Sequence, residues 1–339
     1  MIRRPLGSTG IEVGEVGLGT WELSGDVWGA KDDAVSMAAL RAALDGGATF
    51  VDTAADYGQG HVEELIGRLW VGGGAGGVRR EEVVLATKIR PECMVFAPAP
   101  ERPITEFFRP EWIRSELEVS LGRLRTDYVD VLFLHTWSRS WGHEDEWFAV
   151  MAGLKEAGLI RAIGISVADE GASDANVAVA LGQVDVVQCV YSVFQQEPEA
   201  TLFPLAAKHG VGVVARSVFS SGALVQDWGA QPDFPPGDWR ATWPQEEKRD
   251  WFAEQRRMAG EVKAAMDGAA AAVPRHEFCL RYALEPAAVS VAIPGSANPD
   301  HVRANTAVSG AGALPEEARR QVKQLWLDRR IRGTYNGSG

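Results

Sequence analysis

Apolar runs and helix-like segments alternate along almost the whole chain. Near-continuous apolar runs, typical of buried parallel strands, predict strands at 13–18, 49–52, 83–88, 128–135, 160–166, 185–189, 211–216 and 288–293. Apolar residues spaced three and four apart predict helices at 32–44, 62–70, 110–124, 145–157, 174–181, 199–209, 246–266 and 276–284. Eight strands with helical crossovers predict an α/β fold, a (β/α)8 TIM barrel, with a doubly wound sheet as the alternative.

Three of the predicted strands end in an ionisable side chain. Asp52, Lys88 and His135 end the second, third and fourth strands, and Tyr57 follows the first of these three. Because the carboxyl ends of parallel strands converge on one mouth of a barrel, we expect the four side chains to meet there. Taken singly, each has an ordinary structural explanation, such as an N-cap or a core histidine. Their joint placement favours a shared site.

These four residue types together support one specific chemistry. A tyrosine hydroxyl has a reference pKa of about 10, and a nearby ammonium group lowers it by stabilising the phenolate. Lys88 is suited to act in this way on Tyr57, and Asp52 would hold Lys88 in place. His135 would orient a carbonyl group by hydrogen bonding. The set predicts acid–base chemistry on a carbonyl compound.

Composition narrows the classes of function. The chain has 339 residues, of which 46% are hydrophobic, so it can bury a large core, and we expect a single domain over residues 1–339. The 34 basic residues against 46 acidic ones give a net charge of −12. Such a charge disfavours nucleic acid and anionic membranes as partners.

Cysteine usage and the N-terminus indicate a reducing compartment. Cys93, Cys189 and Cys279 are isolated and odd in number, which argues against a disulfide framework or a structural zinc site. Residues 1–7 contain two arginines, but no apolar run or cleavage site follows them. We expect a cytoplasmic protein without a transmembrane segment. No metal site is expected, because the histidine–glutamate pairs of the chain have no third ligand.

Three irregular segments interrupt the alternation. Residues 90–109 and 225–245 follow the strands that end in Lys88 and Arg216, and both are long and contain prolines and aromatic residues. Loops after barrel strands lie over the mouth, so we expect both to be substrate lids. Residues 72–77 match the pattern GxGxxG, but they follow a helix rather than a strand. We interpret them as a connector and not as a dinucleotide site.

Several motifs resemble those of the aldo-keto reductase superfamily. They are F-V-D-T-A-A-D-Y-G at 50–58 with E-E-L-I-G at 63–67, T-K at 87–88, D-Y-V-D-V-L-F-L-H at 127–135, G-I-S at 164–166 and I-P-G-S at 293–296. The motifs occur in order over nearly the whole chain and are jointly very specific. The resemblance implies a barrel capped by a short N-terminal hairpin, with long loops over its C-terminal face. It also implies a nicotinamide cofactor that is bound without a Rossmann motif.

The resemblance assigns roles to individual positions. It implies a catalytic set of Asp52, Tyr57, Lys88 and His135, with Tyr57 as the general acid that protonates the carbonyl oxygen as hydride arrives from the nicotinamide. It implies cofactor contacts from the strand ends and the C-terminal segment: Gly19, Thr20, Trp21, Asp52, Ser166, Gln188, Arg216, Ser217, Ser296, His301, Arg303 and Asn305. The implied reaction is the reduction of an aldehyde or ketone, sugar-like carbonyls included, by NADPH.

Departures from the family pattern bear on the cofactor. Arg216 stands where an aromatic side chain usually stacks on the nicotinamide. A cation there is unfavourable to the oxidised ring, so we predict a bias toward the reduced cofactor. Val167 replaces an asparagine that often contacts the carboxamide, and the basic residues that usually clasp the 2′-phosphate are reduced to His301 and Arg303. NADPH is the expected cofactor, with NADH as the alternative.

Aromatic residues in the loops after the strands are candidates for the substrate pocket. The expected substrate contacts are Trp28, Tyr57, Phe96, His135, Trp137 and Trp141. Exposed aromatic side chains there would form a broad apolar pocket for small-molecule carbonyl substrates. The structural alternative is that the tryptophans pack the loops onto the barrel.

Two other classes of function stay open on the sequence. The same fold suits a non-catalytic nicotinamide-binding regulatory subunit that senses redox state for another protein. A different barrel enzyme, such as an aldolase with Lys88 as a Schiff-base nucleophile, is the third hypothesis. The sequence carries no signal for the oligomeric state or for the physiological substrate.

Overall fold

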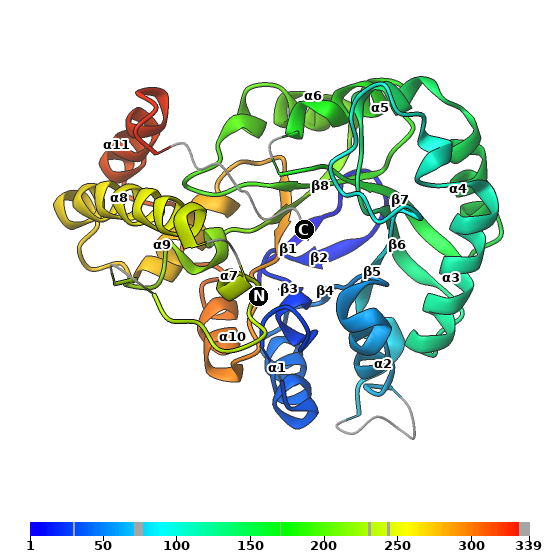
Figure 1. Ribbon diagram of the computed structural model, residues 1–339, viewed down its shortest axis with the longest axis horizontal. Coiled ribbons are helices and arrows are strands. Elements are labelled where there is room, and N and C mark those ends of the chain that lie inside the picture. Colours follow the sequence, from blue (N-terminus) through cyan, green and yellow to red (C-terminus); the bar gives the residue numbers. More distant parts are fainter. Residues whose placement is uncertain (30, 71–76, 170, 230–231, 243–244, 332–339) are drawn as a thin grey trace.

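The computed structural model describes the chain apart from residues 30, 71–76, 170, 230–231, 243–244 and 332–339. Within this described part, eight strands form one parallel sheet in the order β10-β9-β8-β7-β6-β5-β4-β3. The amide of Gly17 donates to the carbonyl of Ala292 and the amide of Gly19 to that of Pro294, which joins the two outer strands. The sheet therefore curls into a barrel with helices around it (Figure 1).

The barrel strands follow the predicted apolar runs. They are β3 (Leu18–Gly19), β4 (Phe50–Asp52), β5 (Val84–Ile89), β6 (Val129–Leu134), β7 (Ile160–Ser166), β8 (Val186–Val190), β9 (Gly212–Arg216) and β10 (Val289–Ala292). The predicted strand 13–18 is wrong in extent, because it divides into β2 (Glu12–Gly14) and β3. The chain approaches β4 closely at Gly17, where a Cβ atom would lie 2.7 Å from the carbonyl oxygen of Phe50.

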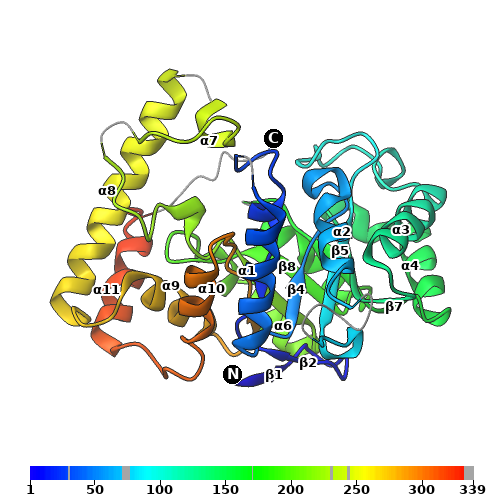
Figure 2. The same ribbon diagram turned by 90° about the horizontal axis from the view of Figure 1, so that it is seen from below.

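Helices cover the outside of the barrel. They are α1 (Asp33–Asp45), α2 (His61–Gly67), α3 (Pro110–Leu124), α4 (Glu146–Glu156), α5 (Asn176–Ala180), α6 (Leu202–His209), α7 (Trp239–Thr242), α8 (Gln245–Ala269), α9 (Arg275–Leu284), α10 (Pro299–Thr306) and α11 (Glu316–Leu327). α3 has its predicted bounds, with proline in the first turn. α8 and α11 pack against each other on one flank (Figures 1 and 2). None of the helices in the described ranges is long and apolar enough to cross a membrane.

A short antiparallel hairpin closes one end of the barrel. It consists of β1 (Arg3–Pro5) and β2, and it lies at the end opposite to α7 (Figure 2). Leu6, Ile11 and Val13 are almost fully buried and join a cluster of inward-facing strand residues such as Phe50. The interior at this end is thus a packed core. The predicted barrel with its N-terminal hairpin is confirmed.

The loops after the strands gather at the other end. The segment after β5 contains a short 3-10 turn (Ile104–Glu106), and the segment after β9 leads into α7 and α8. Residues 230–231 and 243–244 of the predicted lid 225–245 lie outside the described residues, as does the glycine-rich connector except for Gly77. The parallel sheet therefore places all its carboxyl ends, and the residues that follow them, around one opening.

Candidate active site

A cavity of about 1080 Å³ lies at the carboxyl ends of the barrel strands. Its volume is at the upper end of the usual range for ligand sites, so it has room for a cofactor together with a small substrate. Most of the predicted site residues line it: Gly19, Thr20, Trp21, Trp28, Asp52, Tyr57, Phe96, His135, Ser166, Gln188, Arg216, Ser217, Ser296, His301 and Asn305. The fold thus brings together residues that are distant in sequence.

Lys88 lies fully buried beneath the cavity. Its Nζ donates to Oδ2 of Asp52 at 2.7 Å, to the carbonyl of Thr53 at 2.8 Å and to the hydroxyl of Tyr57 at 3.3 Å. Burial lowers the pKa of Lys88, although the charge and the hydrogen bond of Asp52 act in the opposite direction. Three acceptors therefore fix the ammonium group directly next to the tyrosine hydroxyl.

Asp52 is held from two sides by neighbouring strands. Its Oδ2 accepts from Lys88, and its Oδ1 accepts from Nε2 of Gln188 at 2.8 Å. The hydroxyl of Ser166 donates to Oε1 of Gln188 at 3.4 Å. A chain of hydrogen bonds therefore runs from β7 through β8 and β4 to Lys88 on β5. The order of the strands in the barrel positions this chain.

His135 follows β6 and lies on the cavity wall. Its ring meets those of Tyr57 and Phe96 edge-on, with centroids 5.9 and 5.2 Å apart. Its Nδ1 lies 3.0 Å from Oδ1 of Asp56, a residue that the sequence analysis did not single out. Burial acts to raise the pKa of Asp56, but the charge and hydrogen bond of His135 and the charge of Lys88 outweigh it and lower that pKa. The carboxylate of Asp56 is therefore ionised beside the imidazole.

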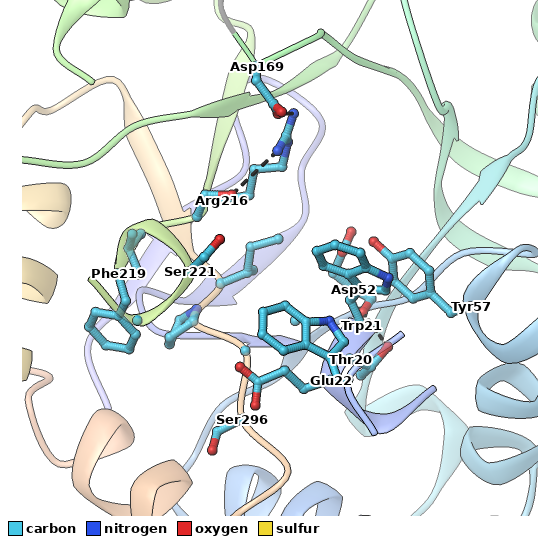
Figure 3. Close-up of a pocket in the computed structure, with 18 of the residues that line it drawn as sticks. Thr20, Trp21, Glu22, Asp52, Tyr57, Asp169, Arg216, Phe219, Ser221 and Ser296 are labelled. Atoms are coloured by element: carbon cyan, nitrogen blue, oxygen red, sulfur yellow. Dashed lines mark hydrogen bonds and ion pairs between the residues drawn. The ribbon is translucent and has the colours of Figure 1, made fainter. Parts of the chain in front are cut away.

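Arg216 ends β9 and carries its own acidic partner. Its Nη2 lies 2.6 Å from Oδ1 of Asp169 and donates to the carbonyl of Val167 at 3.0 Å. Figure 3 shows this pair apart from the group formed by Asp52 and Tyr57. Because Asp169 offsets the positive charge, the bias toward a reduced cofactor should be smaller than an unpaired arginine would give.

The C-terminal segment supplies a third part of the wall. Ser296, His301 and Asn305 line the cavity. Arg303, which the sequence analysis grouped with them, lies outside the lining residues and forms an exposed ion pair with Asp300 on the same helix at 2.6 Å. The reason is helical spacing, because residues two apart on a helix face different directions.

The loop after β9 crosses to the loop after β3. Asp238 and Trp28 form an antiparallel bridge, and the amide of Trp239 donates to the carbonyl of Val27 at 2.7 Å. Arg240 pairs with Asp238 and lies 4.7 Å from the ring centre of Trp28. Asp238 and Arg240 also line the cavity. No local sequence pattern marks these two residues, because their position depends on the path of a long loop.

Trp137 and Trp141 do not line the cavity. Both are almost fully buried, and their indole N–H groups donate to the carbonyls of Asp174 at 3.1 Å and Arg102 at 2.7 Å. The expectation that they are exposed at the mouth is wrong, and the structural alternative applies to them. They fix two loops to the barrel, whereas Phe96 from one of these loops does reach the cavity.

The polar groups of the cavity fit a nicotinamide cofactor. The side chains of Ser166 and Gln188 are buried in the wall, and their mutual contact of 3.4 Å is long, which leaves a hydroxyl and an amide oxygen for a carboxamide. Gly19 lets two segments of the wall approach each other closely, because a Cβ atom there would lie 3.0 Å from the carbonyl oxygen of Ile293. These hydrogen-bonding groups and the volume of the cavity both suit a nicotinamide cofactor.

A match to a protein-family model identifies the family of this chain. The model of the aldo/keto reductase family matches residues 15–327. The chain belongs to the aldo/keto reductase family. Aldo/keto reductases are oxidoreductases that act on carbonyl compounds, and membership places this chain among NAD(P)H-dependent enzymes.

Named aldo/keto reductases are similar over much of the chain. It is 35% identical to aldo-keto reductase YhdN of Bacillus subtilis (strain 168) over 65% of its own length and 62% of that protein, which is less than two thirds. It is 30% identical to the NADH-specific methylglyoxal reductase of Escherichia coli (strain K12) over 75% and 76% of the two chains. Another relative, 31% identical, is named aldo-keto reductase yakc [NADP(+)] of Schizosaccharomyces pombe (strain 972 / ATCC 24843) and covers 67% and 64%. The family thus does not decide the cofactor.

Solved aldo/keto reductase structures have the same fold. The glycerol dehydrogenase AKR11B4 from Gluconobacter oxydans superposes with a TM-score of 0.74 at 25% identity and covers 99% of this chain and 98% of that one. The holo form of aldo-keto reductase AKR11C1 from Bacillus halodurans gives 0.71 at 25% identity, with 96% of each chain covered.

Proposed function

We propose that this aldo/keto reductase uses NADPH to reduce an aldehyde or ketone, sugar-like carbonyls included, with Tyr57 as the general acid. The observation that carries the proposal is the contact of Nζ of Lys88 with both Asp52, at 2.7 Å, and the hydroxyl of Tyr57, at 3.3 Å. A tyrosine hydroxyl is a poor proton donor at neutral pH unless a neighbouring cation stabilises the phenolate that it leaves. Lys88 supplies that cation.

A bound NADPH supplies the hydride, and the remaining steps fall to side chains of the protein. Tyr57 donates its proton to the carbonyl oxygen, and the ammonium of Lys88 stabilises the resulting phenolate. Asp52 keeps Lys88 in position. His135 donates a hydrogen bond to the same oxygen and orients it. In the reverse reaction the phenolate of Tyr57 accepts the proton.

Different parts of the cavity would hold different parts of the cofactor and substrate. Ser166 and Gln188 would bind the carboxamide, and Ser296, His301 and Asn305 would bind the phosphate and adenosine half. The aromatic rings of Trp21, Trp28 and Phe96 would cover the substrate. The names of two relatives, a methylglyoxal reductase and a glycerol dehydrogenase, support including small oxygen-rich compounds among the candidates.

A panel of carbonyl compounds, read by NADPH absorbance and run in parallel with NADH, tests the proposal. We expect Tyr57→Phe to lower carbonyl-dependent NADPH oxidation by about 10²-fold or more, the usual contribution of general acid catalysis. Tyr128→Phe is the matched control, because Tyr128 lies outside the cavity with its ring against Arg80. Full turnover by Tyr57→Phe would refute the assignment.

Binding measurements on the same protein distinguish NADPH from NADH and test the alternative function. Dissociation constants for NADPH and NADH, measured by fluorescence, test the choice of cofactor, and a clear preference for NADH would overturn it. Tight cofactor binding without turnover of any compound in the panel would favour a regulatory subunit instead.

A further inference from the structure

One ionised residue in the cavity has no role in the reaction described above. Asp56 lies between β4 and Tyr57, and its side chain is 20% exposed, while that of His135 is 14% exposed. Their nearest atoms, Oδ1 of Asp56 and Nδ1 of His135, are 3.0 Å apart. Within the described residues, neither atom has a partner that meets strict hydrogen-bond geometry, and the 3.0 Å separation makes each the nearest candidate for the other. The contact therefore bears on which hydrogen atoms the imidazole carries.

Hydrogen-bonding capacity limits the imidazole to two states. An ionised carboxylate only accepts, so Nδ1 must carry a hydrogen atom when it faces Asp56. A neutral imidazole has one N–H group, which would leave Nε2 as a bare acceptor. Donation from Nε2 to a carbonyl oxygen then requires a second hydrogen atom. Only the imidazolium form satisfies Asp56 and a carbonyl group together.

We propose that Asp56 is a positioning residue that keeps His135 in the imidazolium form, so that Nε2–H donates to the carbonyl oxygen of the substrate. The inference rests on the proposed function. During reduction Tyr57 gives up its proton to that oxygen, whereas His135 retains both of its hydrogen atoms. The imidazolium then stabilises the negative charge that develops on the oxygen.

The charges around this pair support the assignment. The charge of Lys88 acts on Asp56, and Lys88 has Asp52 as its own partner on β4. The charge of Asp56 also acts on Arg90, which follows β5. Arg90 forms an ion pair with Glu116 of α3 at 2.8 Å. Tyr57 and Phe96 face the imidazole with their rings. Lys88 and the partly exposed Arg90 therefore each have an acid of their own, and Asp56 is the acid that faces His135.

The variant Asp56→Asn tests the proposal with little change of shape. An amide can still bond to Nδ1, but it carries no charge, so a doubly protonated imidazole loses its electrostatic partner. We expect kcat for carbonyl reduction in the variant to fall on the order of tenfold as the pH rises from about 6 to about 8. The wild-type protein should keep its kcat over this range, and the Kd for NADPH should be the same in both.

The chain contains a matched control for this experiment. Asp33 contacts Nε2 of His61 at 2.8 Å, and both lie outside the cavity-lining residues. Asp33→Asn removes the acid from this second aspartate–histidine pair and should leave the pH profile of kcat unchanged. A profile of Asp56→Asn that coincides with that of the wild-type protein would overturn the proposal.

A measurement without turnover separates this proposal from the proposed function. The ring signals of His135, identified by their loss in His135→Gln, can be followed by NMR against pH in the cofactor-free protein. We expect the doubly protonated ring to persist to higher pH in the wild-type protein than in Asp56→Asn. Identical titrations would refute the role of Asp56 whether or not the protein reduces carbonyl compounds, while absence of turnover alone would refute only the proposed function.

A double-mutant cycle tests whether Asp56 acts through His135. In the His135→Gln background, Asp56→Asn should have no further effect on kcat. A further loss as large as in the wild-type background would contradict the mechanism, because Asp56 would then act on another group.

Discussion

Removal of one charge from the buried ion pair of Asp52 and Lys88 tests how strongly the two side chains depend on each other. The side chains of Asp52 and Lys88 are 3% and 0% exposed, and their charged atoms lie 2.7 Å apart. Loss of one partner from a buried ion pair destabilises a protein by about 3–5 kcal/mol, because the other charge stays buried without compensation. In Asp52→Asn, Lys88 keeps the carbonyl of Thr53 as an acceptor. We therefore expect Asp52→Asn to lower the free energy of unfolding by about 3 kcal/mol, the lower end of this range.

The reciprocal variant completes the cycle. Lys88→Met leaves the carboxylate of Asp52 with Nε2 of Gln188 as its donor and should cost a similar amount. The double variant buries no unpaired charge, so its loss should be smaller than the sum of the two single losses by roughly 2 kcal/mol. Lys263→Met is the control, since Lys263 forms an exposed ion pair with Asp267 on α8 and should change stability by less than about 1 kcal/mol.

Equilibrium unfolding in urea, followed by tryptophan fluorescence, measures these free energies. The chain has 12 tryptophans, several of them in the packed core, which provide the signal. Losses that add within about 0.5 kcal/mol in the double variant would show that the two charges are independent, and the account of the buried pair would be wrong.

Two further variants test one residue of the cavity wall and one that packs a loop outside it. Asp169→Asn leaves the charge of Arg216 uncompensated, and we expect the ratio of Kd for NADP+ to Kd for NADPH, measured by calorimetry, to rise severalfold; an unchanged ratio would contradict a position of Arg216 beside the nicotinamide. Trp137→Phe removes a buried indole hydrogen bond and should lower the free energy of unfolding by about 1–3 kcal/mol while KM for the carbonyl substrate is unchanged. A changed KM with unchanged stability would indicate that Trp137 contacts the substrate.

The barrel and the residues at its strand ends could be predicted because one physical rule governs both. Strands buried on two faces have near-continuous apolar sequence, so Asp52, Lys88 and His135 stand out where the apolar runs stop. Parallel strands then carry their ends to the same edge of the sheet. The conformation of the loops does not enter for these residues. Ser166 and Gln188 also lie at strand ends beside the cavity, but it was the family resemblance that assigned them to the cofactor.

The parts that sequence did not predict depend on loop conformation. The contact between Asp56 and His135 requires the turn after β4, in which Gly58 and Gln59 have positive φ angles of 58° and 55°. A tryptophan has the same apolar sequence signal whether it lines a cavity or packs a loop, which is why Trp137 and Trp141 were assigned incorrectly. Their burial is settled by tertiary packing that no local pattern encodes.

The packed hairpin end of the barrel has a consequence for the supply of protons. Leu6 and Phe50 belong to a cluster of buried apolar side chains at this end, and Lys88 is fully buried. Tyr57 lies at the other end, where the cavity opens. On the proposed mechanism, ligands that fill this opening would shield Tyr57 from solvent, so we expect the tyrosine to regain its proton after they leave.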